Sequence, residues 1–344
     1  MKSMLALKKI INVMMVCWSI VLWTSVLQAS ENNTYGCDQS HQLEPHAFSV
    51  IANIDFHSPD DDSVSRELGS ILTYPQGFYI DEKDNELYLL RYTDSLPKKA
   101  ILEIYDWPAG SYKKTLYLKD TGGVISEGLY VSSSNGKSRS AYIRAKEGIK
   151  VYNFTSDAKT TEKVAGEYIT KISMAQSFSF FAGQWYVEAP EDGGQARTGR
   201  GKYNVYAENF IREGVRDFDP RIAGYGDSEK RDLLKHQGFA KFKSGFVMSI
   251  GGFWRRSWPV TGYSTQGVAI FSNDSKCRVI YTIAADRLSN MLAGKKFAVD
   301  RLENEGVQIL QDGSVILLNI YQIYRKRRGG IVILQVDINK ADVE

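Results

Sequence analysis

The sequence has few of the residues that interrupt strands or build reactive centres. It contains eight Pro, three Cys and four His in 344 residues, and its formal net charge is only +3. No low-complexity run is present, which argues against a disordered chain. The sequence also lacks a CxxC pair, an HExxH motif, a Gly-rich phosphate loop and a nucleophile elbow. We therefore expect no cofactor and no metal, and only the placement of charges can indicate a partner.

Five copies of one short unit organise the rest of the chain. Each copy starts with Gln or Glu, enters a strand of alternating pattern, and passes through a turn into a second strand. The copies begin about 50 to 70 residues apart, at Gln76, Glu127, Gln176, Gln237 and Glu305. Strand-rich repeats of about this length are typical of β-propeller blades. The sequence therefore predicts an all-β fold, a five-bladed β-propeller over residues 48–340, with no second domain.

The first strand of this domain is expected to complete the last blade. Phe48–Phe56 alternates like a strand but precedes the first repeat, and the last repeat ends after Ile331–Ile338 without an outermost strand. Pairing the two would close the ring and remove an exposed sheet edge. Two segments of helical character between repeats, Ser228–Lys235 and Ala285–Lys295, account for the longer steps.

Residues 1–29 have the layout of a signal peptide, with early lysines, an apolar run and a small residue, Ala29, at the expected cleavage point. An uncleaved membrane anchor is the alternative, because the run is nearly long enough to span a bilayer. Cleavage leaves Cys37 and Cys277, which suggest one disulfide between the N-terminal arm, residues 30–47, and a later blade. Two unpaired thiols are the other possibility. We expect a secreted or periplasmic monomer, without stable membrane insertion once the signal is cleaved.

Charge placement predicts one cationic face. In an antiparallel meander, the entry to the first strand and the loop between the second and third strands lie on the same edge. These loops carry Lys or Arg in every repeat, including Lys98, Lys99 and Lys146, and some carry Trp or Tyr. Such a face would attract an anionic polysaccharide, unless the charges are simply solvated. The predicted ligand-binding residues are Gln76, Arg91, Glu127, Gln176, Gln237, Trp254, Arg255, Arg256, Trp258, Glu305, Tyr321 and Arg325. The basic run around Arg325 also suits nucleic acid, but the predicted export argues against that partner.

The candidate catalytic residues are Glu127, Glu305 and His236. Two carboxylates across a channel can act as acid and base on a glycosidic bond, with a histidine as base. Alternatively, a ring of Gln and Glu at the strand starts satisfies open backbone groups around the channel. The residues leave both interpretations open.

The segment YPQGFYIDEKDNELYLLR, residues 74–91, followed by ILEIYDWPAGSYKKTLYL, residues 101–118, resembles a known family. It is the five-bladed propeller family shared by teichoic acid biosynthesis protein C and a staphylococcal phage receptor-binding protein. HQGF at 236–239 and NEGVQILQDG at 304–313 are similar to its later repeats. The resemblance covers about residues 48–340 and implies association with cell-wall glycopolymers, which are polyol phosphates. It transfers no catalytic residue. The chain departs from the family in its predicted signal peptide and disulfide.

These observations predict a secreted propeller that binds an anionic cell-surface glycopolymer, teichoic-acid-like or another acidic polysaccharide. One alternative is a glycan-cleaving hydrolase or lyase that uses the carboxylates at the channel mouth. Another is a protein-interaction scaffold, adhesive or bacteriocin-like.

Overall fold

The computed structural model describes residues 37–55, 65–66, 68–69, 72–134, 137–155, 162–175, 177–190, 201–218, 238–242, 244–251, 254–255, 261–262, 265–294, 301–323 and 328–338. Cys37–Glu344 forms one compact unit. The predicted signal peptide and the predicted helical segment Ser228–Lys235 lie outside the described residues. None of the described helices is long and apolar enough to cross a membrane.

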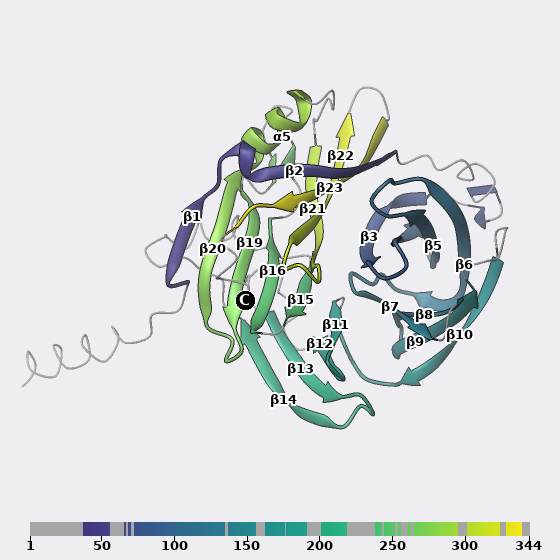
Figure 1. The fold of residues 1–344 in the computed structure, drawn as a ribbon. Helices are drawn as coiled ribbons and strands as arrows, with labels where there is room; N and C mark the ends of the chain where they lie inside the picture. Colours follow the sequence, from purple (N-terminus) through teal and green to yellow (C-terminus); the bar gives the residue numbers. More distant parts are fainter. Residues whose placement is uncertain are drawn as a thin grey trace, which may run out of the picture. The chain divides into compact units, whose positions relative to one another are not determined.

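The largest sheet consists of two antiparallel meanders of four strands each. The first meander contains β3 (Leu72–Asp81), β4 (Glu86–Thr93), β5 (Lys98–Asp106) and β6 (Tyr112–Gly123). The second contains β7 (Leu129–Ser134), β8 (Ser138–Ala145), β9 (Gly148–Thr155) and β10 (Glu162–Thr170). A parallel pairing of β6 with β10 joins them into one eight-stranded sheet. The sheet curves so far that its two edge strands, β3 and β7, are neighbours (Figure 1).

The remaining strands form three further sheets. A four-stranded meander contains β11 (Phe178–Phe181), β12 (Gln184–Glu188), β13 (Gly201–Ala207) and β14 (Arg212–Phe218). The next sheet contains β15 (Phe239–Phe242), β16 (Gly245–Ile250), β19 (Thr265–Ser272), β20 (Cys277–Ala284) and β1 (Gln39–Gln42). The last contains β18 (Thr261–Gly262), β17 (Trp254–Arg255), β21 (Arg301–Ile309), β22 (Val315–Ile323), β23 (Arg328–Val336) and β2 (Phe48–Asp55).

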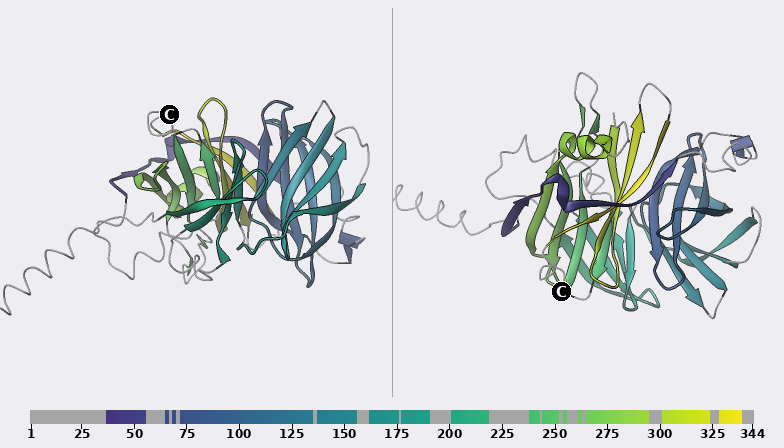
Figure 2. Two further views of the ribbon diagram at one scale, coloured as in Figure 1. Left: turned by 90° about the horizontal axis from the view of Figure 1, so that it is seen from below. Right: turned by 45° about the horizontal axis from the view of Figure 1, so that its top comes forward.

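Residues 37–55 pair with strands of the last two sheets. Strand β2 pairs antiparallel with β23, as the sequence predicts for the segment that begins at Phe48 (Figure 1). Strand β1 pairs parallel with β20, and the predicted disulfide between Cys37 and Cys277 is present next to it. The short helix η1 (Pro45–Ala47) follows β1. Helix α5 (Ala285–Gly294), which the sequence anticipates, packs against η1 and β20 (Figure 2).

Burial changes from the middle to the edge of a meander. Every residue of β4 is buried, because both faces of this central strand are covered by apolar side chains. Strand β14, at the edge of its sheet, is mostly exposed, and only Phe218 is buried. The apolar core therefore lies between neighbouring meanders rather than in one central cluster. The result is an all-β, propeller-like fold.

Candidate functional site

The first strands of the meanders converge next to the repeated Gln or Glu, which is followed by Gly in four of the five copies and by Ser177 in the third. Strands β3, β7, β11, β15 and β21 are neighbours in that order, and β21 is in turn a neighbour of β3. A Cβ added to Gly238 would lie 2.5 Å from the Cα of Gly306, and one added to Gly128 would lie 2.6 Å from the amide nitrogen of Phe178. The Gly in the repeat is therefore required by close approach of the inner strands.

A cavity of about 560 Å³ runs along these inner strands, from Glu127 to the turn between β21 and β22. The residues two positions after each Gln or Glu all line it and are buried: Phe78, Leu129, Phe178, Phe239 and Val307. The residues three positions after also line it and are half-buried: Tyr79, Tyr130, Ser179, Ala240 and Gln308. We call this cavity the central pocket.

One wall of the central pocket is a cluster of aromatic rings. Tyr130 lies 5.6 Å from Tyr79 and 4.9 Å from Phe180, measured between ring centroids. Phe180 in turn packs 4.5 Å from Trp185, which is buried behind it. Burial is the main cause that raises the pKa of Tyr79, and the neighbouring Tyr130 adds to it; burial also raises the pKa of Tyr130. Both hydroxyls therefore stay neutral and can donate hydrogen bonds.

Lys241 is the basic side chain in the lining of the central pocket. Its ammonium lies 4.8 Å from the ring centre of Phe246 and 5.3 Å from that of Phe181. It donates hydrogen bonds to the Phe242 carbonyl and, at 3.0 Å, to Asn273 Oδ1. Burial and repulsion from Arg216 lower the pKa of Lys241 to about 8.

Side-chain hydrogen bonds join the last inner strand to the first. Gln308 accepts a bond from the Ile80 amide and donates one to the Ile80 carbonyl, both at 2.8 Å. Gln76 Nε2 donates to Glu305 Oε2 at 3.5 Å. At this junction the backbone of Ile80 is therefore satisfied by Gln308, three positions after Glu305, whereas the repeated residues Gln76 and Glu305 bond to each other.

The two candidate carboxylates occupy different environments. Glu127 is half-buried and lines the central pocket, whereas Glu305 is fully buried beside Gln76. Arg144 donates to the Ile125 carbonyl at 2.6 Å, and its charge interacts with Glu127 and Glu188. Of the two carboxylates, Glu127 belongs to the lining of the central pocket and Glu305 does not.

Besides Glu305, three predicted ligand-binding residues that were expected on accessible loops are buried, so that expectation is wrong for them. Arg91 is 3% exposed within β4 and forms a 2.9 Å ion pair with the buried Glu103. Trp254 is 3% exposed and packs in the core between the last two sheets. Tyr321 is also buried, and its hydroxyl donates to Asn53 Oδ1 at 3.0 Å. Arg91 and Tyr321 lie within β4 and β22, which extend past these residues, and Trp254 pairs with Leu302 of β21.

The other predicted site residues divide into three groups. Gln76 is half-buried within β3, and Glu127 is half-buried two residues before β7. For Arg255, only the backbone pairing with Thr261 and Arg301 is described. The residues outside the described parts of the chain are Gln176, His236, Gln237, Arg256, Trp258 and Arg325.

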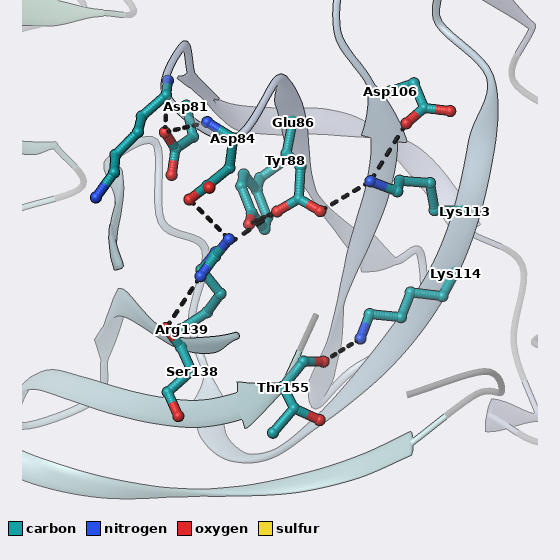
Figure 3. A network of polar contacts seen from close by, with 11 residues as sticks. Asp81, Asp84, Glu86, Tyr88, Asp106, Lys113, Lys114, Ser138, Arg139 and Thr155 are labelled. Carbon is teal, nitrogen blue, oxygen red and sulfur yellow. Dashed lines mark hydrogen bonds and ion pairs between the residues drawn. The ribbon is translucent and has the colours of Figure 1, made fainter. Parts of the chain in front are cut away.

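A buried polar network links the first two meanders (Figure 3). Arg139, at the start of β8, forms ion pairs with Asp84 at 2.7 Å and Glu86 at 3.6 Å. The Tyr88 hydroxyl donates to Glu86, and Lys113 bridges Glu86 at 2.9 Å and Asp106 at 3.2 Å. None of these six residues lines the central pocket, so their arrangement indicates a role in holding the two meanders together.

Sequence reasoning missed the residues two and three positions after each repeated Gln or Glu. The signal was available, since aligning the five copies places Tyr79, Tyr130 and Gln308 at equivalent positions. Alternation along a strand next to a channel predicts that one of these positions faces the channel.

No known protein-family model matches this chain, and no curated protein matches it in sequence. Among solved structures, the chain is similar to the tail fiber of Staphylococcus aureus phage P68, at 11% identity and a TM-score of 0.52. That match covers 85% of this chain and 53% of the tail fiber chain, so this chain spans about half of it.

Two further similar structures have lower TM-scores. One is the RS223 beta-xylosidase, at 12% identity and a TM-score of 0.45, covering 80% of this chain and 94% of that one. The other is a putative exported protein from Bacteroides fragilis, at 9% identity and a TM-score of 0.43, covering 86% and 99%. The similarity to the tail fiber agrees, at the level of fold, with the predicted resemblance to a staphylococcal phage receptor-binding protein. The predicted resemblance to teichoic acid biosynthesis protein C stays a prediction.

Proposed function

We propose that the protein is an exported, carbohydrate-binding β-propeller that holds part of an anionic cell-surface glycopolymer in its central pocket. The observation that carries this proposal is the half-buried aromatic wall of that pocket. Tyr79, Tyr130 and Phe180 offer flat apolar surface, and Gln308, Ser179 and Lys241 offer polar groups next to it. Sugar rings have apolar faces and hydroxyl edges, and this combination matches both. The volume of about 560 Å³ is within the range of small-molecule sites.

The proposed propeller has five blades. Four of them are the meanders β3–β6, β7–β10 and β11–β14 and the group β15, β16, β19 and β20. The fifth comprises β21, β22, β23 and the N-terminal β2. The cyclic order of the inner strands and the bonds from Gln308 to Ile80 support closure between the last blade and the first. Export is supported by the Cys37–Cys277 disulfide, since such bonds persist in oxidising compartments.

The test is binding of the chain from Ser30 to purified acidic and neutral surface polysaccharides and their oligosaccharides. Tyr130→Ala should weaken binding by about tenfold, whereas Tyr130→Phe, which keeps the ring, should retain most of it. Ile211→Ala, an exposed apolar position on another surface, is the control. Thermal unfolding of each variant separates lost binding from lost folding. Equal affinities for wild type and Tyr130→Ala would refute the pocket. A failure to bind any glycan, together with capture of a protein partner, would favour the scaffold alternative.

A glycan-cleaving activity is the second candidate, because Glu127 lines the central pocket. In this proposal the Glu127 carboxylate would act as a base on a bound sugar, and Arg144, whose charge interacts with it, would be a positioning residue. Shortening of the polymer and appearance of new reducing ends, both abolished by Glu127→Gln, would support this activity. If the polymer binds the protein but stays intact after prolonged incubation, the cleavage activity is refuted and the binding function remains.

A further inference from the structure

A second cavity, of about 700 Å³, lies in the eight-stranded sheet where β6 and β10 separate. The two strands pair in parallel from Leu116 to Lys119, after which β10 turns to pair with β9 and β6 continues to Gly123. Gly122 and Gly123 have φ of +74° and +75°, which allow β6 to change direction there. We call this cavity the lysine groove.

The lining of the lysine groove is much more basic than the chain as a whole. It contains six lysines and two carboxylates, although the net charge of the whole protein is only +3. The lysines come from four strands, β5, β6, β9 and β10, and from the turn between β8 and β9: Lys98, Lys99, Lys119, Lys146, Lys150 and Lys163. A concave surface lined by one sign of charge focuses potential and attracts counter-charges.

The described contacts of three of these lysines, Lys98, Lys99 and Lys150, are with uncharged groups. Lys150 donates to the Asp120 carbonyl at 2.7 Å and lies 4.6 Å from the ring centre of Tyr168. Lys98 and Lys99 donate to main-chain carbonyls at 2.9 and 2.5 Å. These acceptors are uncharged. Glu147, one of the two lining carboxylates, already forms a 3.2 Å ion pair with Lys171, which is not part of the lining.

The basic residues that line the lysine groove are lysines rather than arginines, and this indicates which kind of anion the groove suits. Arginine forms bidentate pairs with a single oriented phosphate or carboxylate, whereas lysine acts as a point charge without a fixed geometry. Six lysines distributed over four strands and one turn therefore suit a series of charges along an extended chain. Tyr117 and Tyr168 add ring surface to the same lining.

We propose that the lysine groove binds the phosphate, sulfate or carboxylate groups of a polyanionic glycan, as a site separate from the central pocket. The choice of a glycan over another polyanion rests on the proposed carbohydrate-binding function. The two sites have no lining residue in common. A long polymer that occupied both would gain avidity without a tighter contact at either.

The experiment compares dextran sulfate with unsulfated dextran, which share a backbone and differ in charge. The test variant changes the exposed Lys119, Lys146 and Lys163 to Gln. The control variant changes three exposed lysines elsewhere, Lys83, Lys137 and Lys276, to Gln, so that both variants lose the same net charge. Binding is measured by fluorescence anisotropy across a salt series.

We expect the test variant to bind dextran sulfate about tenfold more weakly at low salt, and the control variant to differ from wild type by less than about twofold. The salt dependence of binding should also decrease in the test variant. Equal weakening in both variants, or none in either, would overturn the proposal. A DNA oligonucleotide that binds as tightly as dextran sulfate, with the same loss in the test variant, would overturn the assignment to a glycan.

The two proposals fail separately. Loss of dextran sulfate binding in the lysine variant but not in Tyr130→Ala supports the groove, whatever the central pocket binds. If surface oligosaccharides do not bind the pocket at all, the proposed function fails while the groove result stands on its own.

Discussion

Replacing Arg139 tests whether the buried network between the first two meanders stabilises the fold (Figure 3). Only 3% of the Arg139 side chain is exposed, and it forms ion pairs with both Asp84 and Glu86. Removing one partner of a buried ion pair costs about 3–5 kcal/mol, because the other charge stays buried. Here Glu86 keeps Lys113, and the Asp84 side chain is 27% exposed. We therefore expect Arg139→Ala to lower the free energy of unfolding by about 3 kcal/mol, at the lower end of that range.

Urea unfolding followed by tryptophan fluorescence measures this loss. Lys171→Ala is the matched control, because it removes an ion pair with Glu147 whose side chains are 69% and 54% exposed. Exposed pairs contribute only about 0–1 kcal/mol. The double change Arg139→Met with Glu86→Gln should recover part of the loss, since it removes charge from both sides of one pair.

A loss for Arg139→Ala no larger than that of the control would refute the reasoning. A double variant that is less stable than the sum of its single changes would also contradict it. In either case the network would be a consequence of the packing between the meanders rather than one of its causes.

Three further predictions concern stability. The pKa of Lys241 is about 8 in the fold against 10.5 for a free lysine, so the unfolded chain binds more protons between these values. The free energy of unfolding should therefore rise with pH across this window, and urea midpoints for Lys241→Met should show a smaller rise. Gly238→Ala places a Cβ 2.5 Å from backbone atoms and should cost about 1–3 kcal/mol, whereas Gly214→Ala, with no atom within 4 Å, should change thermal stability by less than about 0.5 kcal/mol. Removing the Cys37–Cys277 disulfide, which joins residues 240 apart, should cost about 4–5 kcal/mol, and an unchanged urea midpoint after reduction would contradict this.

Features with a local cause were predictable from the sequence. Strand alternation, turn residues and the repeated Gln or Glu located the inner strands, because each depends on a few consecutive residues. The disulfide was predictable because only Cys37 and Cys277 remain after the predicted leader. The pairing of β2 with β23 was predictable from the number of strands. One strand precedes the first repeat and the last repeat lacks its outermost strand, so pairing the two leaves neither with an exposed edge.

The candidate site depended on contacts between repeats and could not be read from one repeat alone. Arg91, Trp254 and Tyr321 look like loop residues in the sequence, but neighbouring sheets cover them. The lysine groove exists because β6 and β10, about 45 residues apart, pair and then diverge. The sequence by itself determined which segments form strands and in what order. Only the tertiary structure decided which side chains are accessible, because burial depends on what packs against a strand and not on the strand itself.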